Sequence, residues 1–237
     1  RDIMATKYDF ETLSQALDMM KSDDSEGRRK GEKVLRQAAC LELGTKNTVP
    51  VREWFISHTK ELMGAITSEK DAKLLWGYIY MLQVFCQRYI QEAYLVCDSE
   101  KFISDGRTAA FKIQAWKTVN SFLSSSNLSV LQAAGSFIWI YGDSRAWDIF
   151  AKVLDKKRDK LTLSHISIAI GGCHRCLIEG GELKDIYNNT VTMDKLIESE
   201  QARKLLKKFT AIMEKTSTAK RLCAVTIDNL REIMTVL

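Results

Sequence analysis

Residues 68–97 form an apolar stretch that constrains the fold more than any other feature of the sequence. The stretch contains no proline and one glycine, and its apolar residues lie on every side of a helical wheel. A helix that is apolar all round is buried inside a protein or a membrane. Polar residues such as Lys73, Gln83 and Arg88 interrupt it too often for a lipid span, which needs about 20 nearly uncharged residues. We therefore predict that residues 68–97 form the buried central helix of a helical domain.

The fold class follows from how little the sequence contains that would break a helix. Pro50 is the only proline in 237 residues, whereas β-sandwiches and barrels need many proline and glycine turns. The sequence predicts an all-α protein with two compact lobes and about ten helices around the central helix. The polar run 124–127 is the best candidate boundary, which gives an N-terminal lobe over 4–123 and a C-terminal lobe over 128–237. One continuous domain is the alternative.

Several helices have recognisable ends. Asp9 is placed to cap a first helix that ends near Met20, and Ser68 with Asp71 resembles a capping box that opens the central helix. The run 137–141 has the composition of a strand, but it is short and has no hairpin partner, so we interpret it as a buried helix end. A helix over 161–178 is expected to kink or stop at Gly171–Gly172.

Charge and cysteine content limit the cellular environment and the partners that the sequence is compatible with. The formal net charge is +5 and the pI is about 8.8, which is compatible with a nucleic-acid partner without being diagnostic. The sequence does not open on a basic lead and an apolar core of the signal-peptide type, and its six cysteines lie mostly in apolar helical runs. These features predict a cytoplasmic protein with free thiols in a reducing compartment and no membrane partner.

Cys173-His174-Arg175-Cys176 is the one motif with the spacing of a chemical site. A thioredoxin-like redox function would need a later proline facing the dithiol, and no proline follows Pro50. A structural zinc site would need a second close pair of ligands, which the sequence lacks. We favour two packed thiols on one helix face.

Other chemistry finds little support in the sequence. The three histidines, His58, His165 and His174, form no recognisable catalytic or metal-binding arrangement, and no glycine-rich nucleotide loop is present. We therefore predict no enzymatic activity, no catalytic residues, no cofactor and no metal.

Basic residues form three clusters, at 28–36, 152–160 and 203–221. A single charged run is usually a solvated helix face, but three runs could converge on one groove in the folded protein. Lysine and arginine side chains along such a track bind backbone phosphates and release counterions. The predicted phosphate-binding residues are Arg28, Arg29, Lys33, Lys156, Lys157, Arg158, Lys160, Arg203, Lys204, Lys207 and Lys208.

These clusters favour a protein that holds single-stranded RNA in a basic cleft without sequence specificity and self-associates. In length, helicity and mild basicity the chain is similar to compact nucleoproteins of segmented negative-strand RNA viruses, although no motif carries this similarity. The terminal segments 4–24 and 218–237 are predicted to dock on neighbouring subunits. The alternative function is a helical scaffold or adaptor that binds a protein through an apolar groove. Aromatic residues expected to stack on bases are Trp147, Phe150, Tyr187 and Phe209.

Overall fold

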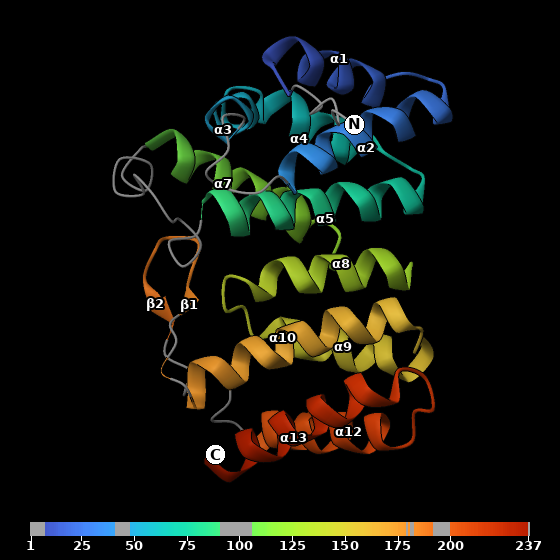
Figure 1. The fold of residues 1–237 in the computed structure, drawn as a ribbon, viewed down its shortest axis with the longest axis vertical. Helices are drawn as coiled ribbons and strands as arrows, with labels where there is room; N and C mark the ends of the chain where they lie inside the picture. The colour runs from blue at the N-terminus through green and yellow to red at the C-terminus, as the bar shows by residue number, and fades with distance from the viewer. Residues whose placement is uncertain are drawn as a thin grey trace, which may run out of the picture. The chain divides into compact units, whose positions relative to one another are not determined.

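A computed structural model describes residues 8–40, 48–90, 106–178, 180, 183–191 and 200–236. This part of the chain contains eleven α-helices and one β-hairpin whose strands have two residues each, so the predicted all-α class is confirmed (Figure 1). The chain divides into two units, Arg1–Thr118 and Val119–Leu237, and the division falls in the last turn of α7 (Gly106–Asn120). Residues 124–127, the predicted boundary, lie near the start of unit 2. None of the helices in the described ranges has the length and apolar character needed to cross a membrane.

Unit 1 is built from helices that pack both on their neighbours in the sequence and on more distant helices. α1 (Phe10–Met20) packs on α2 (Ser25–Ala39), and α2 packs on the central helix α5 (Ala72–Tyr89). α3 (Thr48–Ser57) and α4 (Thr59–Ser68) lie between α2 and α5 in the sequence, and α3 and α4 each contact α1. The predicted first helix and its cap are confirmed, because Asp9 accepts a hydrogen bond from the backbone N–H of Thr12 at the start of α1.

The core of unit 1 follows one face of α5. Phe85 stacks on Phe55 of α3 and on Tyr89, with ring centroids 4.3 and 5.0 Å apart, and meets Phe111 of α7 edge to face. All four rings are fully buried. The prediction of a buried central helix is therefore confirmed for residues 72–89, and the remaining predicted turns at 91–97 lie outside the described residues.

The predicted start of the central helix at Ser68 is wrong. Ser68 is the last residue of α4, where its hydroxyl donates to the carbonyl of Ala65. Asp71 is the N-cap of α5, and its carboxylate accepts from the backbone N–H groups of Lys73 and Leu74. The stretch 59–89 is thus two helices separated by a short turn.

Two aspartates that cap unit 1 helices give an expected pH dependence. Hydrogen bonds from first-turn N–H groups, foremost those of Gly27 and Leu74, lower the pKa values of Asp24 and Asp71. A lowered pKa in the folded state adds stability that is complete above the unfolded aspartate pKa of about 4 and is lost as the pH falls through the folded value. We expect the urea midpoint of unit 1 to fall on acidification below about pH 4, as measured by urea titrations at a series of pH values.

The control for this prediction keeps the cap and removes its charge. The double variant Asp24→Asn, Asp71→Asn retains a side-chain acceptor at each helix start. Its urea midpoint should change less with pH than that of the parent protein. An equal acid dependence in both proteins would assign the effect to other carboxyl groups.

The described part of unit 2 contains five further helices and a small hairpin. The helices are α8 (Leu128–Trp139), α9 (Arg145–Lys156), α10 (Lys160–Ile178), α12 (Glu200–Glu214) and α13 (Lys220–Val236). β1 (Leu183–Lys184) pairs antiparallel with β2 (Thr190–Val191), with Leu183 opposite Val191. Residues 137–139 lie in α8, which confirms a helix over the strand-like alternative. Of the expected kink or stop at Gly171–Gly172, the stop is wrong, since α10 continues to Ile178.

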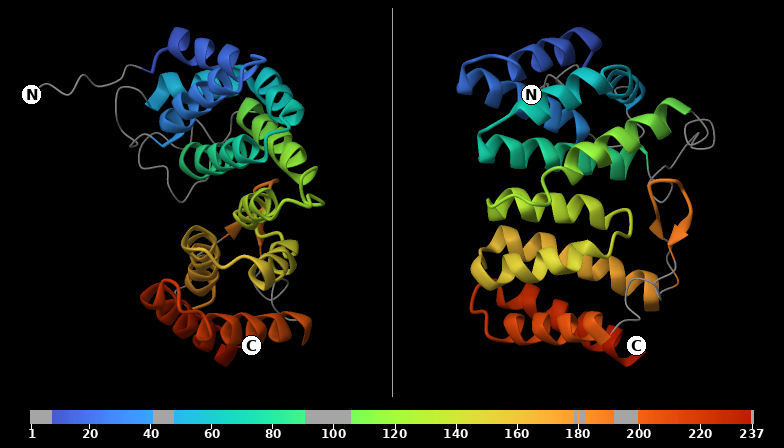
Figure 2. Two further views of the ribbon diagram at one scale, coloured as in Figure 1. Left: turned by 90° about the vertical axis from the view of Figure 1, so that its right-hand side faces the viewer. Right: turned by 180° about the vertical axis from the view of Figure 1, so that it is seen from behind.

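The helices of unit 2 pack on their neighbours in the sequence, α8 on α9 and α12 on α13, and also on more distant helices (Figure 2). α9 packs on α12, α10 packs on α13, and α8 contacts both α9 and α10. Trp147 of α9 lies at the centre of an aromatic cluster and contacts Trp139, Phe150 and Phe209, with centroids 4.9 to 6.4 Å apart. This packing buries one face of α9 and α12 and leaves the opposite, charged face exposed.

Candidate nucleic-acid interface

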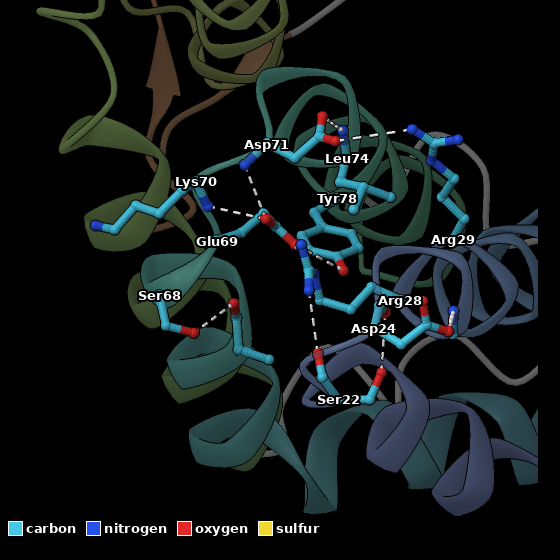
Figure 3. A network of polar contacts seen from close by, with 12 residues as sticks. Ser22, Asp24, Arg28, Arg29, Ser68, Glu69, Lys70, Asp71, Leu74 and Tyr78 are labelled. Carbon is cyan, nitrogen blue, oxygen red and sulfur yellow. Dashed lines mark hydrogen bonds and ion pairs between the residues drawn. The ribbon is translucent and has the colours of Figure 1, made fainter.

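The basic cluster on α2 is partly built into the fold of unit 1 (Figure 3). Arg28 Nε lies 3.0 Å from Glu69 Oε2, and Arg28 Nη1 donates to the carbonyls of Ser22 and Asp23. The Glu69 side chain is only 3% exposed. The Arg28 guanidinium therefore joins α2 to the α1–α2 turn and to the α4–α5 turn.

Glu69 is satisfied on both carboxylate oxygens. Its Oε1 accepts from the backbone N–H groups of Lys70 and Asp71, each at 2.8 Å, and its Oε2 accepts from Arg28 and, at 3.4 Å, from the hydroxyl of Tyr78. Burial and the neighbouring Glu69 raise the pKa of Tyr78, so this hydroxyl stays protonated and donates. The network is a structural connection rather than an open phosphate site.

The other two predicted contacts on α2 are more accessible. Arg29 is exposed and reaches Asp71 only at 3.9 Å. Lys33 is exposed and has no ion pair with another described residue. Of the three predicted residues in unit 1, Arg28 is thus the least available to a ligand.

The second cluster lies at the end of α9 and the start of α10. Lys157 is half-buried, donates to Ser129 Oγ at 2.7 Å and pairs with Asp159 at 3.3 Å. Arg158 uses its Nε to cap the carbonyl of Leu154. Lys156 and Lys160 are exposed, and neither has an ion pair with a described residue.

Asp159 places a negative charge inside this cluster. It caps α10 by accepting from the N–H and the hydroxyl of Thr162. Burial opposes its ionisation, but these hydrogen bonds and the nearby Lys157 prevail and lower its pKa. The carboxylate is therefore ionised at neutral pH and neutralises part of the charge of Lys157.

The third cluster is on α12, and the fold brings it next to the second. Lys208 Nζ lies 2.8 Å from Asp155 Oδ2, which joins α12 to the last turn of α9. Lys204 pairs with Glu200 on its own helix at 3.0 Å. Arg203 and Lys207 are exposed without an acidic partner among the described residues. Two of the three predicted clusters thus lie on neighbouring elements of one unit.

The α9–α10 junction and α12 together have an excess of positive charge. Residues 145–160 and 200–214 contain ten lysines and arginines against five aspartates and glutamates. That excess equals the formal net charge of the whole chain, +5. We give the name basic surface to four of the predicted residues that are exposed and have no acidic partner among the described residues: Lys156, Lys160, Arg203 and Lys207.

The expected base-stacking residues are wrong in three of four cases. Trp147, Phe150 and Phe209 are buried in the core of unit 2. Tyr187, in the turn between β1 and β2, is 68% exposed. Buried rings cannot stack on bases, so the chemistry of the basic surface is attraction for anions, without an aromatic platform.

Lys152 is a further exposed cation on α9 that the predicted set omitted. It lies four residues before Lys156 and therefore on the same helix face. That spacing was the signal in the sequence that could have identified it. Its position extends the exposed positive charge along α9.

The cysteine motif lies on α10. Cys173 is buried and Cys176 is half-buried, and no disulfide joins them. Burial raises the pKa of both thiols, which keeps them protonated at neutral pH. Within the described ranges, no group of three or more His, Cys, Asp or Glu side chains is placed to hold a metal ion.

Comparison with known proteins does not extend this description. No known protein family, no curated protein and no solved structure matches the chain. What the fold and the surface define is an all-α protein with a basic helix surface in its second unit.

Proposed function

We propose that the protein binds RNA through the phosphate backbone, with the basic surface of unit 2 as the contact. The observation that carries the proposal is the placement of Lys156, Lys160, Arg203 and Lys207. These side chains are exposed and have no acidic partner among the described residues. Lys156, Arg203 and Lys207 lie on α9 and α12, which the Lys208–Asp155 contact joins, and Lys160 begins α10. Unpaired cations on adjacent helices are available to phosphates without the cost of breaking an ion pair.

The burial of the aromatic residues shapes the proposal. Recognition of single strands normally combines a positive track with stacked aromatic side chains. In unit 2 the positive track is exposed, whereas Trp147, Phe150 and Phe209 are in the core. Binding by phosphate contacts alone should therefore be independent of sequence and strongly dependent on salt.

Charge reversal in the basic surface should remove this binding. We expect the triple variant Lys156→Glu, Arg203→Glu, Lys207→Glu to bind a labelled RNA oligonucleotide at least about 10-fold more weakly than the parent protein at low salt. For a single strand, log K falls with log salt with a slope of about −0.7 per phosphate contact. Losing three contacts should therefore make this slope less steep by about 2. Fluorescence anisotropy at several salt concentrations measures both quantities.

A matched control separates local contacts from net charge. Lys60, Lys70 and Lys73 are exposed lysines of unit 1, and their reversal to glutamate changes the net charge by the same amount. This control variant should keep most of the affinity and the salt slope. Equal losses in the two triple variants, or no measurable RNA binding by the parent protein, would refute the proposal.

A scaffold that binds a protein partner is the second candidate function. It is favoured by exposed apolar side chains on α10 and α13, which offer a surface suited to another helix. The two candidates use different surfaces, so they respond differently to mutation. The triple charge reversal in the basic surface should weaken RNA binding but leave the binding of a protein partner to α10 and α13 unchanged.

A further inference from the structure

α10 and α13 present exposed apolar side chains that take no part in the proposed RNA contact, which uses only Lys160 at the start of α10. Five large apolar side chains on these two helices are between 40 and 63% exposed: Leu161, Ile168, Ile178, Val225 and Val236. Single exposed apolar residues are normal in any protein. Five on two adjacent helices form a patch of the kind that marks an interaction surface.

The two helices run side by side in the same direction. Thr226 of α13 donates to Ser167 of α10 at 2.8 Å, and Glu232 of α13 meets His174 of α10 at 2.5 Å. The residue numbers rise together along both helices, so the helices are parallel. Because a helix rises about 1.5 Å per residue, any residue of α10 can be placed level with its neighbour on α13.

Four of the five exposed apolar residues lie on one face of this pair, and Ile178 lies about 80° away from Ile168 around α10. Leu161, Ile168 and Arg175 are spaced by seven residues on α10, and Val225 and Glu232 are spaced by seven on α13. Residues seven apart lie close to the same side of a helix. Gly171 lies between Ile168 and Arg175 on α10, beside α13. A Cβ at Gly171 would meet nothing nearer than Asn229 Nδ2 of α13, at 3.9 Å.

The face is complementary to itself. Two copies can be placed with these faces together and related by a two-fold axis that runs parallel to the helices. In that arrangement α10 of each copy packs on α13 of the other. Ser167 and Thr226 lie at the same height along the two helices. Measured along the helix direction from that height, Ile168 is then within about 3 Å of Val225 in the second copy.

The charges on this face agree with the same arrangement. Arg175 is exposed without an acidic partner among the described residues, and it comes level with Glu232 of the second copy. Glu232 uses one carboxylate oxygen on His174 and has the other available.

We infer that the α10–α13 face is an isologous interface through which two copies of this chain form a dimer, with α10 of each copy across α13 of the other. In a closed two-fold dimer the same patch serves both copies, so every favourable contact occurs twice. The inference assigns the predicted self-association through the terminal helices to one face of α13 together with α10. It does not depend on RNA binding, since no residue of the basic surface takes part.

Sedimentation velocity on the full chain tests the dimer directly. The parent protein should change from 27.0 kDa to twice that mass between about 1 and 100 μM. The variant Ile168→Glu, Val225→Glu should raise the dissociation constant at least about 10-fold, because it places charges in the apolar centre of the interface. The matched control Phe10→Glu, Val49→Glu changes two exposed apolar residues of unit 1 and should leave the mass distribution unchanged.

Complementation in trans tests the orientation. Arg175→Glu alone and Glu232→Arg alone each place like charges opposite one another twice, so both should stay monomeric. A mixture of the two variants restores both attractive pairs and should form a heterodimer. Circular dichroism confirms that each variant is folded, and the mixture provides a positive readout that unfolding could not produce.

Three results would overturn the inference. The first is a parent protein that remains at 27.0 kDa across the concentration range. The second is a dimer that withstands Ile168→Glu, Val225→Glu. The third is a mixture of the two folded charge variants that fails to associate, which would exclude α10 lying across α13.

Discussion

Gly31→Ala should destabilise unit 1 by about 2 kcal/mol, even though alanine is the better helix former. A Cβ at Gly31 would lie 2.3 Å from the carbonyl oxygen of Ala16 and 2.9 Å from the amide nitrogen of Met20. Both atoms belong to the backbone of α1, so the clash cannot be relieved by a side-chain rotation. α1 and α2 must move apart, which opens the packing of Leu13 and Leu17.

Two effects compete at this position, and their magnitudes decide the sign. Replacing a glycine inside a helix by alanine gains about 0.5–1 kcal/mol from backbone entropy. Overpacking a tight helix contact costs about 1–3 kcal/mol, and here the contact is with backbone, which puts the cost at the upper end. The net effect is therefore a loss of stability.

Gly64→Ala is the matched control, with the opposite expected sign. Gly64 is an exposed position inside α4, and nothing lies within 4 Å of a Cβ built there. Only the entropic gain remains, so this variant should be more stable by about 0.5–1 kcal/mol. Urea unfolding followed by tryptophan fluorescence measures both changes, and a Gly31→Ala variant as stable as Gly64→Ala would contradict the close approach of α1 to α2.

Sequence periodicity predicted the helices well wherever one local signal marked each end. Asp9 begins α1 as expected, because an aspartate before an apolar-periodic run has no nearby competitor as a cap. Ser68 and Asp71 are both good caps, and the choice between them depends on where α4 stops. That end is fixed by Glu69, whose carboxylate binds residues of the turn and Arg28 from a distant helix. Periodicity contains no information about such a contact.

The candidate site shows the same division between local and long-range information. The exposed face of α12 is apparent from the spacing of Arg203 and Lys207. Before Arg28 or Lys208 can bind a phosphate, an ion pair to Glu69 or Asp155 must break. This cost is not apparent from the sequence, because these partners are 41 and 53 residues away. Only the folded chain distinguishes a paired cation from an available one.

The burial of the aromatic residues could have been predicted. Trp147 and Phe150 share one face of α9 with Ala146 and Leu154, and all four residues are buried. Residues on the apolar face of an amphipathic helix are directed toward the core. The expectation that they stack on bases conflicted with the helix assignment itself, and the pattern of α9 was sufficient to reject it.

Glu69→Ala should destabilise unit 1 by about 3 kcal/mol. The substitution leaves the Arg28 guanidinium half-buried without its carboxylate and removes the acceptor of two backbone N–H groups and of the Tyr78 hydroxyl. Removing one partner of a buried ion pair costs about 3–5 kcal/mol. Because the Arg28 side chain is 22% exposed, water recovers part of this cost, and the lower end applies.

A double-mutant cycle separates the ion pair from the rest of the network. Arg28→Met removes the charge that faces Glu69 but leaves the carboxylate bound to the N–H groups of Lys70 and Asp71. We expect a smaller loss than for Glu69→Ala, and a double variant that loses clearly less than the two single losses added together. Additive losses would show that Arg28 and Glu69 act independently.

Arg29 provides the comparison that connects stability with the RNA proposal. It neighbours Arg28 in the sequence but is exposed and only 3.9 Å from Asp71, so Arg29→Ala should cost less than about 0.5 kcal/mol. If Arg28 has a structural role, Arg28→Met lowers the urea midpoint and leaves the RNA affinity of the remaining folded protein unchanged. Loss of RNA affinity in a stably folded Arg28→Met variant would instead show that Arg28 contacts phosphate. Unit 1 would then be part of the RNA-binding surface.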